Sequence, residues 1–126
     1  MKALQPTVLL VDDNFINRKV SEQILILSGC LVHACDSGAE AINHIRVRTY
    51  DFVFMDCMMP QMDGYEATVE IRLQANFKRI PIVALSSLND EAHHNKCFVS
   101  GMSDVVIKPL TMEMVEGILS KYAKVS

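Results

Sequence analysis

The sequence predicts one α/β domain, in which a doubly wound parallel sheet of five strands is covered by helices on both faces. Short apolar runs alternate along the chain with segments of helical periodicity. The runs lack the polar alternation of half-exposed strands, so we expect strands that are buried on both faces. With 126 residues, half of them hydrophobic, the chain is long enough for one core and too short for two ordinary domains. We therefore expect a single domain over 1–126, with its core at about 7–122 and five helices in right-handed crossovers.

The first strand and helix are predicted from a buried run and a capped amphipathic segment. Thr7 to Val11 is apolar throughout and ends at a pair of aspartates. Asn14 is the expected N-cap of the first helix, and Gly29 is its expected stop. The residues expected to face the sheet recur at helical spacing: Ile16, Val20, Ile24 and Leu27.

The middle of the chain repeats this alternation. Cys30 to Cys35 is the second predicted strand, and Ser37 to Glu40 has the spacing of a capping box that opens the second helix. Phe52 to Met55 is too short and too uniformly apolar for a helix, so it is the predicted central strand, and it ends in Asp56. Asp63 to Glu66 has the spacing of another cap, for the third helix.

The last part of the chain supplies two more strands and helices. Ile80 to Leu85 is the fourth apolar run, and it ends in hydroxyl residues. Asn89 or Asp90 caps a weakly patterned fourth helix that Gly101 ends. Asp104 to Ile107 is the fifth strand. Thr111 then opens a helix with a clear apolar stripe, made of Met114, Val115, Ile118, Leu119 and Tyr122.

Five chemically active side chains follow these apolar runs and should meet at one rim of the sheet. They are Asp12, Asp13, Asp56, Ser86 and Lys108. Three crowded carboxylates repel one another unless a cation neutralises them, and Mg²⁺ prefers oxygen ligands and leaves room for a phosphate. Lys and hydroxyl groups can hold the remaining phosphate charge. Alone, each residue fits a turn or a cap; together they predict a phosphoryl-transfer site with a carboxylate nucleophile.

These motifs resemble the response-regulator receiver domain of two-component signalling, over about Thr7 to Tyr122. The matching segments are Val8-Leu-Leu-Val-Asp12-Asp13-Asn14, Phe54-Met-Asp56-Cys-Met-Met-Pro60-Gln-Met-Asp-Gly64, Ile82-Val-Ala-Leu-Ser86, Gly101-Met-Ser-Asp104 and Lys108-Pro109. They occur in the family's order and approximate spacing, so they are specific jointly although each is weak alone. The resemblance implies a flavodoxin-like fold with strand order 2-1-3-4-5.

The resemblance also implies roles for the residues of the rim. Asp56 would accept a phosphoryl group from a phosphohistidine. Asp12, Asp13, Asp56 and the backbone carbonyl of Met58 would hold Mg²⁺ or Mn²⁺, and Ser86 and Lys108 would bind the phosphoryl oxygens. In such a protein the only catalysed reactions are its own aspartyl phosphorylation and dephosphorylation, so it is not an enzyme acting on an external metabolite.

Three positions near the site depart from the family's usual pattern or carry unusual side chains. Receivers commonly have an aromatic residue three positions before the strand-five lysine, where this chain has Val105. The switch that couples Ser86 to that ring is therefore in doubt: we expect a small response, or one that runs through Ser86 and the fourth helix. Met58 and Leu88 flank the phosphoryl group in the family, and apolar side chains there cannot orient an attacking water, which predicts a long-lived phosphoaspartate.

The resemblance points to a histidine kinase or a histidine phosphotransfer protein as partner. The expected docking surface is Phe15, Ile16, Pro109 and Leu110. The segments Asp12-Asp-Asn-Phe-Ile-Asn-Arg18 and Met62-Asp-Gly-Tyr-Glu-Ala-Thr68 resemble receivers of hybrid histidine kinases. We therefore expect a cytoplasmic domain, either free or joined to a membrane-anchored hybrid kinase, and the sequence leaves open whether it is a monomer or a homodimer.

Composition and spacing disfavour other classes of function. A net charge of −3 and a pI near 5.7 argue against nucleic-acid binding, and no apolar stretch suggests direct membrane contact. A dehalogenase-like phosphatase would place an aspartate at position 58, and a flavin carrier would want a phosphate-binding loop after the first strand. A degenerate receiver that only binds partners remains the main alternative.

The remaining histidines and cysteines are expected to be structural. His93 and His94 are adjacent and lack the spacing of metal ligands on a helix, so we expect solvated or hydrogen-bonded side chains. Cys57 is expected to be a small core residue.

Overall fold

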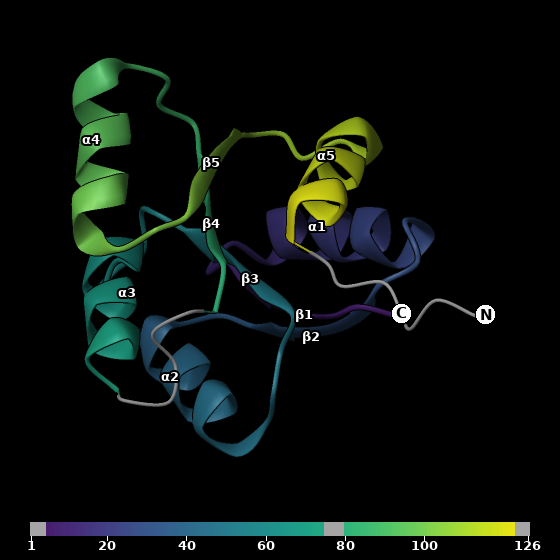
Figure 1. Ribbon diagram of the computed structural model, residues 1–126, viewed down its shortest axis with the longest axis horizontal. Helices are drawn as coiled ribbons and strands as arrows, with labels where there is room; N and C mark the ends of the chain where they lie inside the picture. The colour runs from purple at the N-terminus through teal and green to yellow at the C-terminus, as the bar shows by residue number, and fades with distance from the viewer. Residues whose placement is uncertain (1–4, 75–79, 123–126) are drawn as a thin grey trace.

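The computed structural model describes residues 5–74 and 80–122, and in that part of the chain five parallel strands form one sheet in the order β2-β1-β3-β4-β5. Five helices connect the strands in regular alternation (Figure 1). The elements are β1 (Thr7–Val11), α1 (Phe15–Leu27), β2 (Leu31–Cys35), α2 (Gly38–Val47), β3 (Phe52–Asp56), α3 (Gly64–Leu73), β4 (Ile82–Ser86), α4 (Glu91–Ser100), β5 (Asp104–Ile107) and α5 (Met112–Tyr122). The predicted fold class and strand order are confirmed.

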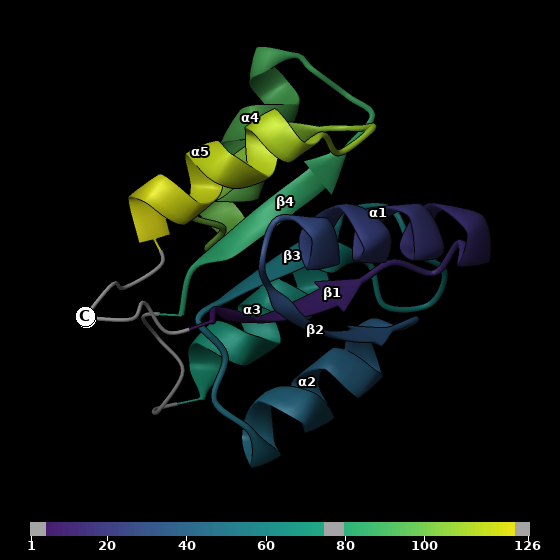
Figure 2. The same ribbon diagram turned by 90° about the vertical axis from the view of Figure 1, so that its right-hand side faces the viewer.

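Helices cover both faces of the sheet, as the buried strands require. α1 and α5 lie on one face, and α2, α3 and α4 lie on the other (Figures 1 and 2). Each face has its own apolar cluster, one around Leu10, Phe54 and Val115 and the other around Val53, Met55 and Ile71. β3 and β4 are buried along their whole length, whereas β2 and β5 are partly exposed because they form the two edges.

Polar side chains fix where the helices begin. Asn14, Ser37, Asp63 and Asp90 each accept a hydrogen bond from the backbone N–H three residues later. At α3 the cap is reciprocal, because the Glu66 carboxylate also accepts from the N–H of Asp63. Gly101 ends α4 at a φ of 111°, a conformation that favours glycine. The expected caps are thus present.

The predicted inward face of α1 is wrong for three of its four residues, while Ile24 is partly buried and packs against the core cluster that contains Leu25. Ile16, Val20 and Leu27 are 66%, 53% and 66% exposed, and the buried residues of the helix are Ser21 and Leu25. The helix packs on the sheet through a narrow stripe that includes a small hydroxyl residue, so its apolar side chains are left on the outer surface. Hydrophobic periodicity alone selected the wrong side of this helix.

Three strands have bounds that differ from expectation, and Arg72 makes hydrogen bonds close to one of them. β2 starts one residue later than predicted, β3 extends by one residue to Asp56, and β4 includes Ser86 but omits Ile80 and Pro81. Arg72 of α3 donates from Nη1 to the Ile80 carbonyl at 2.6 Å and from Nε to the Gly101 carbonyl at 2.9 Å. It thereby fixes the end of α4 against α3. Of the helices in the described ranges, none has the length and apolar character needed to span a membrane.

Candidate functional site

The carboxyl ends of β1, β3, β4 and β5 bring the predicted side chains together at one rim. Asp56 and Ser86 are the last residues of β3 and β4, while Asp12 and Lys108 directly follow β1 and β5. Carboxylate oxygens of Asp12, Asp13 and Asp56 lie within 4.8 Å of one another. Nζ of Lys108 lies 3.2 Å from Oδ1 of Asp56 and 3.6 Å from Oδ2 of Asp12. The convergence expected from the apolar runs is therefore present.

Asp56 is held in an almost closed environment, with only 4% of its surface exposed. Burial, aided by the negative charge of the nearby Asp12, raises the pKa of its carboxyl to about 6 against the opposing effect of the Lys108 ammonium. The N–H of Met58 donates to Oδ1 at 3.2 Å. A carboxylate with this pKa is mostly ionised at neutral pH and is poorly solvated, which suits a nucleophile.

Gly64 explains the close packing of the backbone around Asp56. A Cβ at this position would collide with the backbone carbonyl of Asp56 and with Cα of Cys57. The N–H of Gly64 also donates to the Cys57 carbonyl at 3.1 Å. The glycine of the Met-Asp-Gly segment therefore serves the close approach of α3 to the end of β3.

Asp12 carries a buried oxygen that fits a hard cation. Its side chain is fully buried, and Oδ1 accepts from the N–H of Asn14 at 2.9 Å. Its Oδ2 has no hydrogen-bond partner among the described residues, although Lys108 is near it. A buried carboxylate oxygen without a donor is unusual, and a divalent ion held with Asp13 and Asp56 would supply the missing partner. The donor set, all oxygen, fits Mg²⁺.

Ser86 is oriented by its own loop and by a histidine that sequence reasoning did not connect to the site. Its hydroxyl is buried, donates to the Leu88 carbonyl at 3.2 Å and accepts from the Leu88 N–H at 2.9 Å. Nε2 of His93 lies 2.6 Å from the same Oγ. The expectation of a hydrogen-bonded histidine is confirmed, but its position beside Ser86 was missed. One feature of the sequence could have predicted burial of His93: it precedes the apolar Cys97 by four residues, so the two side chains lie on the same face of α4.

The residue in the usual aromatic position, Val105, is partly buried and pairs with Ala84 across the sheet. It packs against the apolar cluster that includes Cys97 and Met102. A valine side chain offers no hydrogen bond to Ser86. The ring that contacts Ser86 in this structure is supplied by α4 instead of β5.

Cys57, His93 and Cys97 form a buried cluster whose three donor atoms lie within 4.8 Å of one another. Burial raises the pKa of the Cys57 thiol to about 12, so the protonated form dominates. Both ring nitrogens of His93 are already close to hydroxyl oxygens. We interpret the cluster as core packing, in agreement with the expectation for Cys57.

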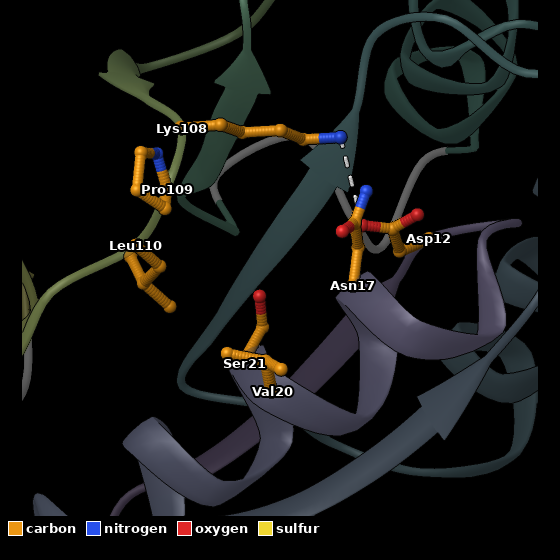
Figure 3. Close-up of a pocket in the computed structure, with 7 residues that line it drawn as sticks. All are labelled: Asp12, Asn17, Val20, Ser21, Lys108, Pro109 and Leu110. Carbon is orange, nitrogen blue, oxygen red and sulfur yellow. Dashed lines mark ion pairs between the residues drawn. The ribbon is translucent and has the colours of Figure 1, made fainter.

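A hollow of about 280 Å³ adjoins the site between α1 and the loop after β5 (Figure 3). Its lining comprises Asp12, Asn17, Val20, Ser21, Lys108, Pro109 and Leu110. Phe15 and Ile16, at the start of α1, are 59% and 66% exposed. Arg18 and Lys19 place their cationic groups 5.5 and 5.7 Å from the centre of the Phe15 ring. The first turns of α1, which lead to the hollow, therefore carry exposed apolar side chains with positive charge beside them.

Of the four residues predicted for docking, Leu110 lies differently from expectation. It is only 5% exposed and packs in the core cluster beneath α1 and α5, because its side chain turns inward at the start of the last connection. Pro109 and Phe15 are exposed, as a docking surface requires, and Ile16 is exposed as well although helical periodicity had placed it on the inward face of α1. Met58 and Leu88, which were expected beside the acceptor, are 63% and 45% exposed.

Comparison with known proteins finds relatives that agree with the resemblance seen in the sequence. Residues 8–119 match the model of the response regulator receiver domain family. The chain is 36% identical over 124 residues to hybrid signal transduction histidine kinase A of Dictyostelium discoideum, covering 95% of this chain and 6% of that protein. This chain thus corresponds to a small part of the hybrid kinases it matches.

Solved structures agree. The receiver domain of the sensor histidine kinase PA1611 of Pseudomonas aeruginosa, with a magnesium ion in its active-site cleft, is 35% identical and has a TM-score of 0.87, over 94% of this chain and 98% of that chain. The receiver domain of Ssk1 from Saccharomyces cerevisiae, crystallised with the histidine phosphotransfer protein Ypd1, is 26% identical with a TM-score of 0.86, over 97% and 91% of the two chains. The fold, the rim of acidic residues and these matches together establish that the chain belongs to the response regulator receiver domain family.

Proposed function

We propose that Asp56 accepts a phosphoryl group from the phosphohistidine of a histidine kinase or histidine phosphotransfer protein. One carboxylate oxygen attacks phosphorus, the bond between phosphorus and the imidazole nitrogen breaks, and the leaving imidazole takes up a proton. The observation that carries the proposal is the Lys108 ammonium 3.2 Å from the buried carboxylate of Asp56, beside the unpartnered Oδ2 of Asp12. A protein built only to bind partners would have no need for this buried arrangement of charge.

Each residue of the rim has a proposed task. Asp12 and Asp13, with Asp56 and the Met58 carbonyl, would hold Mg²⁺ or Mn²⁺; the bound ion supplies positive charge to the transferring group. Lys108 would move its contact from the free carboxylate to a phosphoryl oxygen. The Ser86 hydroxyl would donate a hydrogen bond to another phosphoryl oxygen. The magnesium in the cleft of the PA1611 receiver supports the metal assignment.

The proposed docking surface for the phosphodonor is the exposed start of α1 together with Pro109. Phe15 and Ile16 present exposed apolar side chains in the first turn of α1. Val20, one turn further along α1, lines the hollow together with Lys108 and Asp12 (Figure 3). Apolar anchors surrounded by polar groups are typical of protein interfaces. The crystallised pair of Ypd1 and the Ssk1 receiver supports a histidine phosphotransfer protein as the partner class. The domain would act in the cytoplasm, within a hybrid kinase or apart from one.

The chemistry is tested by the intact mass of the protein after incubation with acetyl phosphate, with and without Mg²⁺. The expected result is one phosphoryl adduct that requires Mg²⁺ and is lost in Asp56→Asn. Asp51→Asn is a matched control, because Asp51 precedes β3 at the opposite end of the strand and should leave the adduct unchanged. A folded wild-type protein without an adduct would favour a receiver that only binds partners.

A further inference from the structure

The hydroxyl of Ser86 is connected to α3 through a single buried ring. Nε2 of His93 lies 2.6 Å from Oγ of Ser86, and Nδ1 lies 2.6 Å from the hydroxyl of Tyr65. His93 is only 6% exposed and Tyr65 only 7%. These three side chains form one chain of hydrogen bonds that runs from the end of β4, through α4, to the first turn of α3.

One arrangement of protons satisfies all of these groups. The Tyr65 hydroxyl donates to Nδ1 of His93, the Nε2–H donates to Ser86 Oγ, and the Ser86 hydroxyl donates to the Leu88 carbonyl. In this neutral tautomer no member of the chain is left without a partner. We assign this tautomer because it also leaves the Ser86 hydroxyl free to donate to the Leu88 carbonyl. With this assignment the ring donates to Ser86, and its bond depends on where the Ser86 hydroxyl points.

The backbone of α4 holds the ring firmly in this place. The N–H of His93 donates to the Asp90 cap at 2.7 Å, so the side chain leaves the first turn of the helix at a fixed position. Lys96, one turn later, lies 4.2 Å from the centre of the Tyr65 ring. His93 and Lys96 of α4 therefore both contact Tyr65 of α3. A change in the orientation of the His93 ring would alter the packing of α4 against α3.

We infer that His93 is the switch partner of Ser86, taking the place of the aromatic residue that β5 lacks at Val105. The inference rests on the proposed phosphorylation of Asp56. When Ser86 turns its hydroxyl toward a phosphoryl oxygen, Oγ leaves the position in which it accepts from Nε2. The Nε2–H is then left with only the weak sulfur acceptor of Cys97, whose Sγ lies 3.6 Å away. Loss of the stronger acceptor in a buried environment is costly, so the first turn of α4 must move until the ring finds another oxygen partner.

The direct test uses the ring nitrogens of the full chain labelled with ¹⁵N-histidine. Spectra of the imidazole nitrogens are recorded before and after addition of Mg²⁺ and beryllofluoride, whose bound form on Asp56 is detected by ¹⁹F resonance. The expected result is a shift of the His93 Nε2 signal in the wild type and its absence in Ser86→Ala. His33 is a matched internal control, because it forms a similar pair with Tyr50 (3.0 Å) near β2, away from Asp56.

Two outcomes separate the inference from the function on which it rests. Bound ¹⁹F signal with an unmoved His93 ring, or an equal shift in Ser86→Ala, would overturn the role of His93 alone. No bound ¹⁹F signal in the folded wild type would overturn the proposed phosphorylation and the inference with it. The test does not depend on the folding of a His93 variant.

An affinity measurement adds a second readout. His93→Gln removes the ring, so Ser86 no longer gives up that hydrogen bond when it turns to the phosphoryl mimic. Beryllofluoride should therefore bind about two- to tenfold more tightly to the variant. His33→Gln, the matched control, should bind as the wild type does. Unchanged or weaker binding to a folded His93→Gln would contradict the inference.

Discussion

Nζ of Lys108 lies 3.2 Å from Oδ1 of Asp56, close enough to oppose the effect of burial on that carboxyl. Replacing Lys108 by Met should raise the pKa of Asp56 further, because burial and Asp12 would then act without the ammonium. We expect the rate of phosphorylation by acetyl phosphate to fall at neutral pH and its pH profile to shift upward by about 1 unit or more. Mass spectrometry over a pH series checks this. Lys121→Met, which removes an ammonium paired with Asp104, should leave the profile in place.

The raised pKa of Asp56, about 6 against an ordinary value of 3.8, makes stability depend on pH. Between these values the unfolded chain releases the proton and the folded chain keeps it, so stability falls as the pH rises from about 4 to about 6. Without divalent ions, Asp56→Asn should therefore be more stable than the wild type at pH 7.5, by about 1 to 3 kcal/mol, and the difference should narrow toward pH 4. Urea unfolding at both pH values measures it. A difference that widens toward acid pH would contradict this account.

Met58 and Leu88 should slow hydrolysis of the phosphoaspartate. Both are exposed apolar residues, and neither side chain can orient water by hydrogen bonding. Met58→Gln and Leu88→Asn should each shorten the lifetime of the adduct, on the order of several-fold. The decay of the adduct mass after removal of acetyl phosphate gives the lifetime. Unchanged lifetimes in both variants would refute the argument.

Phe15 should contribute to docking of the protein phosphodonor and not to the transfer reaction at Asp56. Its ring is 59% exposed at the start of α1, and it takes no part in the hydrogen bond and the ion pair of Asp56 described above. Phe15→Ala should slow phosphoryl transfer from a histidine phosphotransfer protein by about tenfold, the size of a loss above 1 kcal/mol at an interface anchor. Labelling by acetyl phosphate should stay as in the wild type. Val99→Ala, at an 87% exposed position on α4, is the control for loss of an exposed apolar group.

Gly64→Ala should destabilise the fold and displace the acceptor. The added Cβ would collide with the Asp56 carbonyl. This carbonyl is part of the buried β3 backbone, so moving it would cost stability. We expect a loss of about 1 to 3 kcal/mol in thermal or urea unfolding, together with slower labelling of Asp56. Gly117→Ala is the matched control: nothing lies within 4 Å of its Cβ, and in the interior of α5 alanine should stabilise by about 0.5 to 1 kcal/mol.

The rim of the site could be predicted from the sequence because it depends on simple local rules. Uniformly apolar runs such as Phe52–Met55 identify buried parallel strands, and a charged or hydroxyl side chain directly after such a run leaves the core at the same edge of the sheet. Helix starts followed equally local signals, since Asp63 and Asp90 cap through their own side chains. Strand order came from family resemblance, because periodicity carries no information on which strands are neighbours.

The misplaced residues share a physical cause. In α1 the side that packs is chosen by tertiary fit: Ser21 is buried and Val20 is exposed, the reverse of their hydropathy. Leu110 is held inward by the core, although its neighbour Pro109 is exposed. His93 was not connected to the site because a polar residue in a weakly amphipathic helix gives only a weak sign of burial, namely its spacing to Cys97, and Tyr65 lies 28 residues away in the sequence. These positions depend on contacts between elements, which no local pattern records.

The contacts of Arg72 hold one end of α4 in place, so that any movement of this helix is expected to be greatest at its other end. One end of the helix is fastened at Gly101, through the 2.9 Å bond from Arg72, while the other end is attached to Ser86 through His93. A helix of 10 residues is about 15 Å long, so release at the His93 end would swing the helix about its fastened end. Residues near Glu91 would then travel farthest and those near Ser100 least. A partner protein that binds the first turn of α4 would therefore show the largest change in affinity when the helix moves.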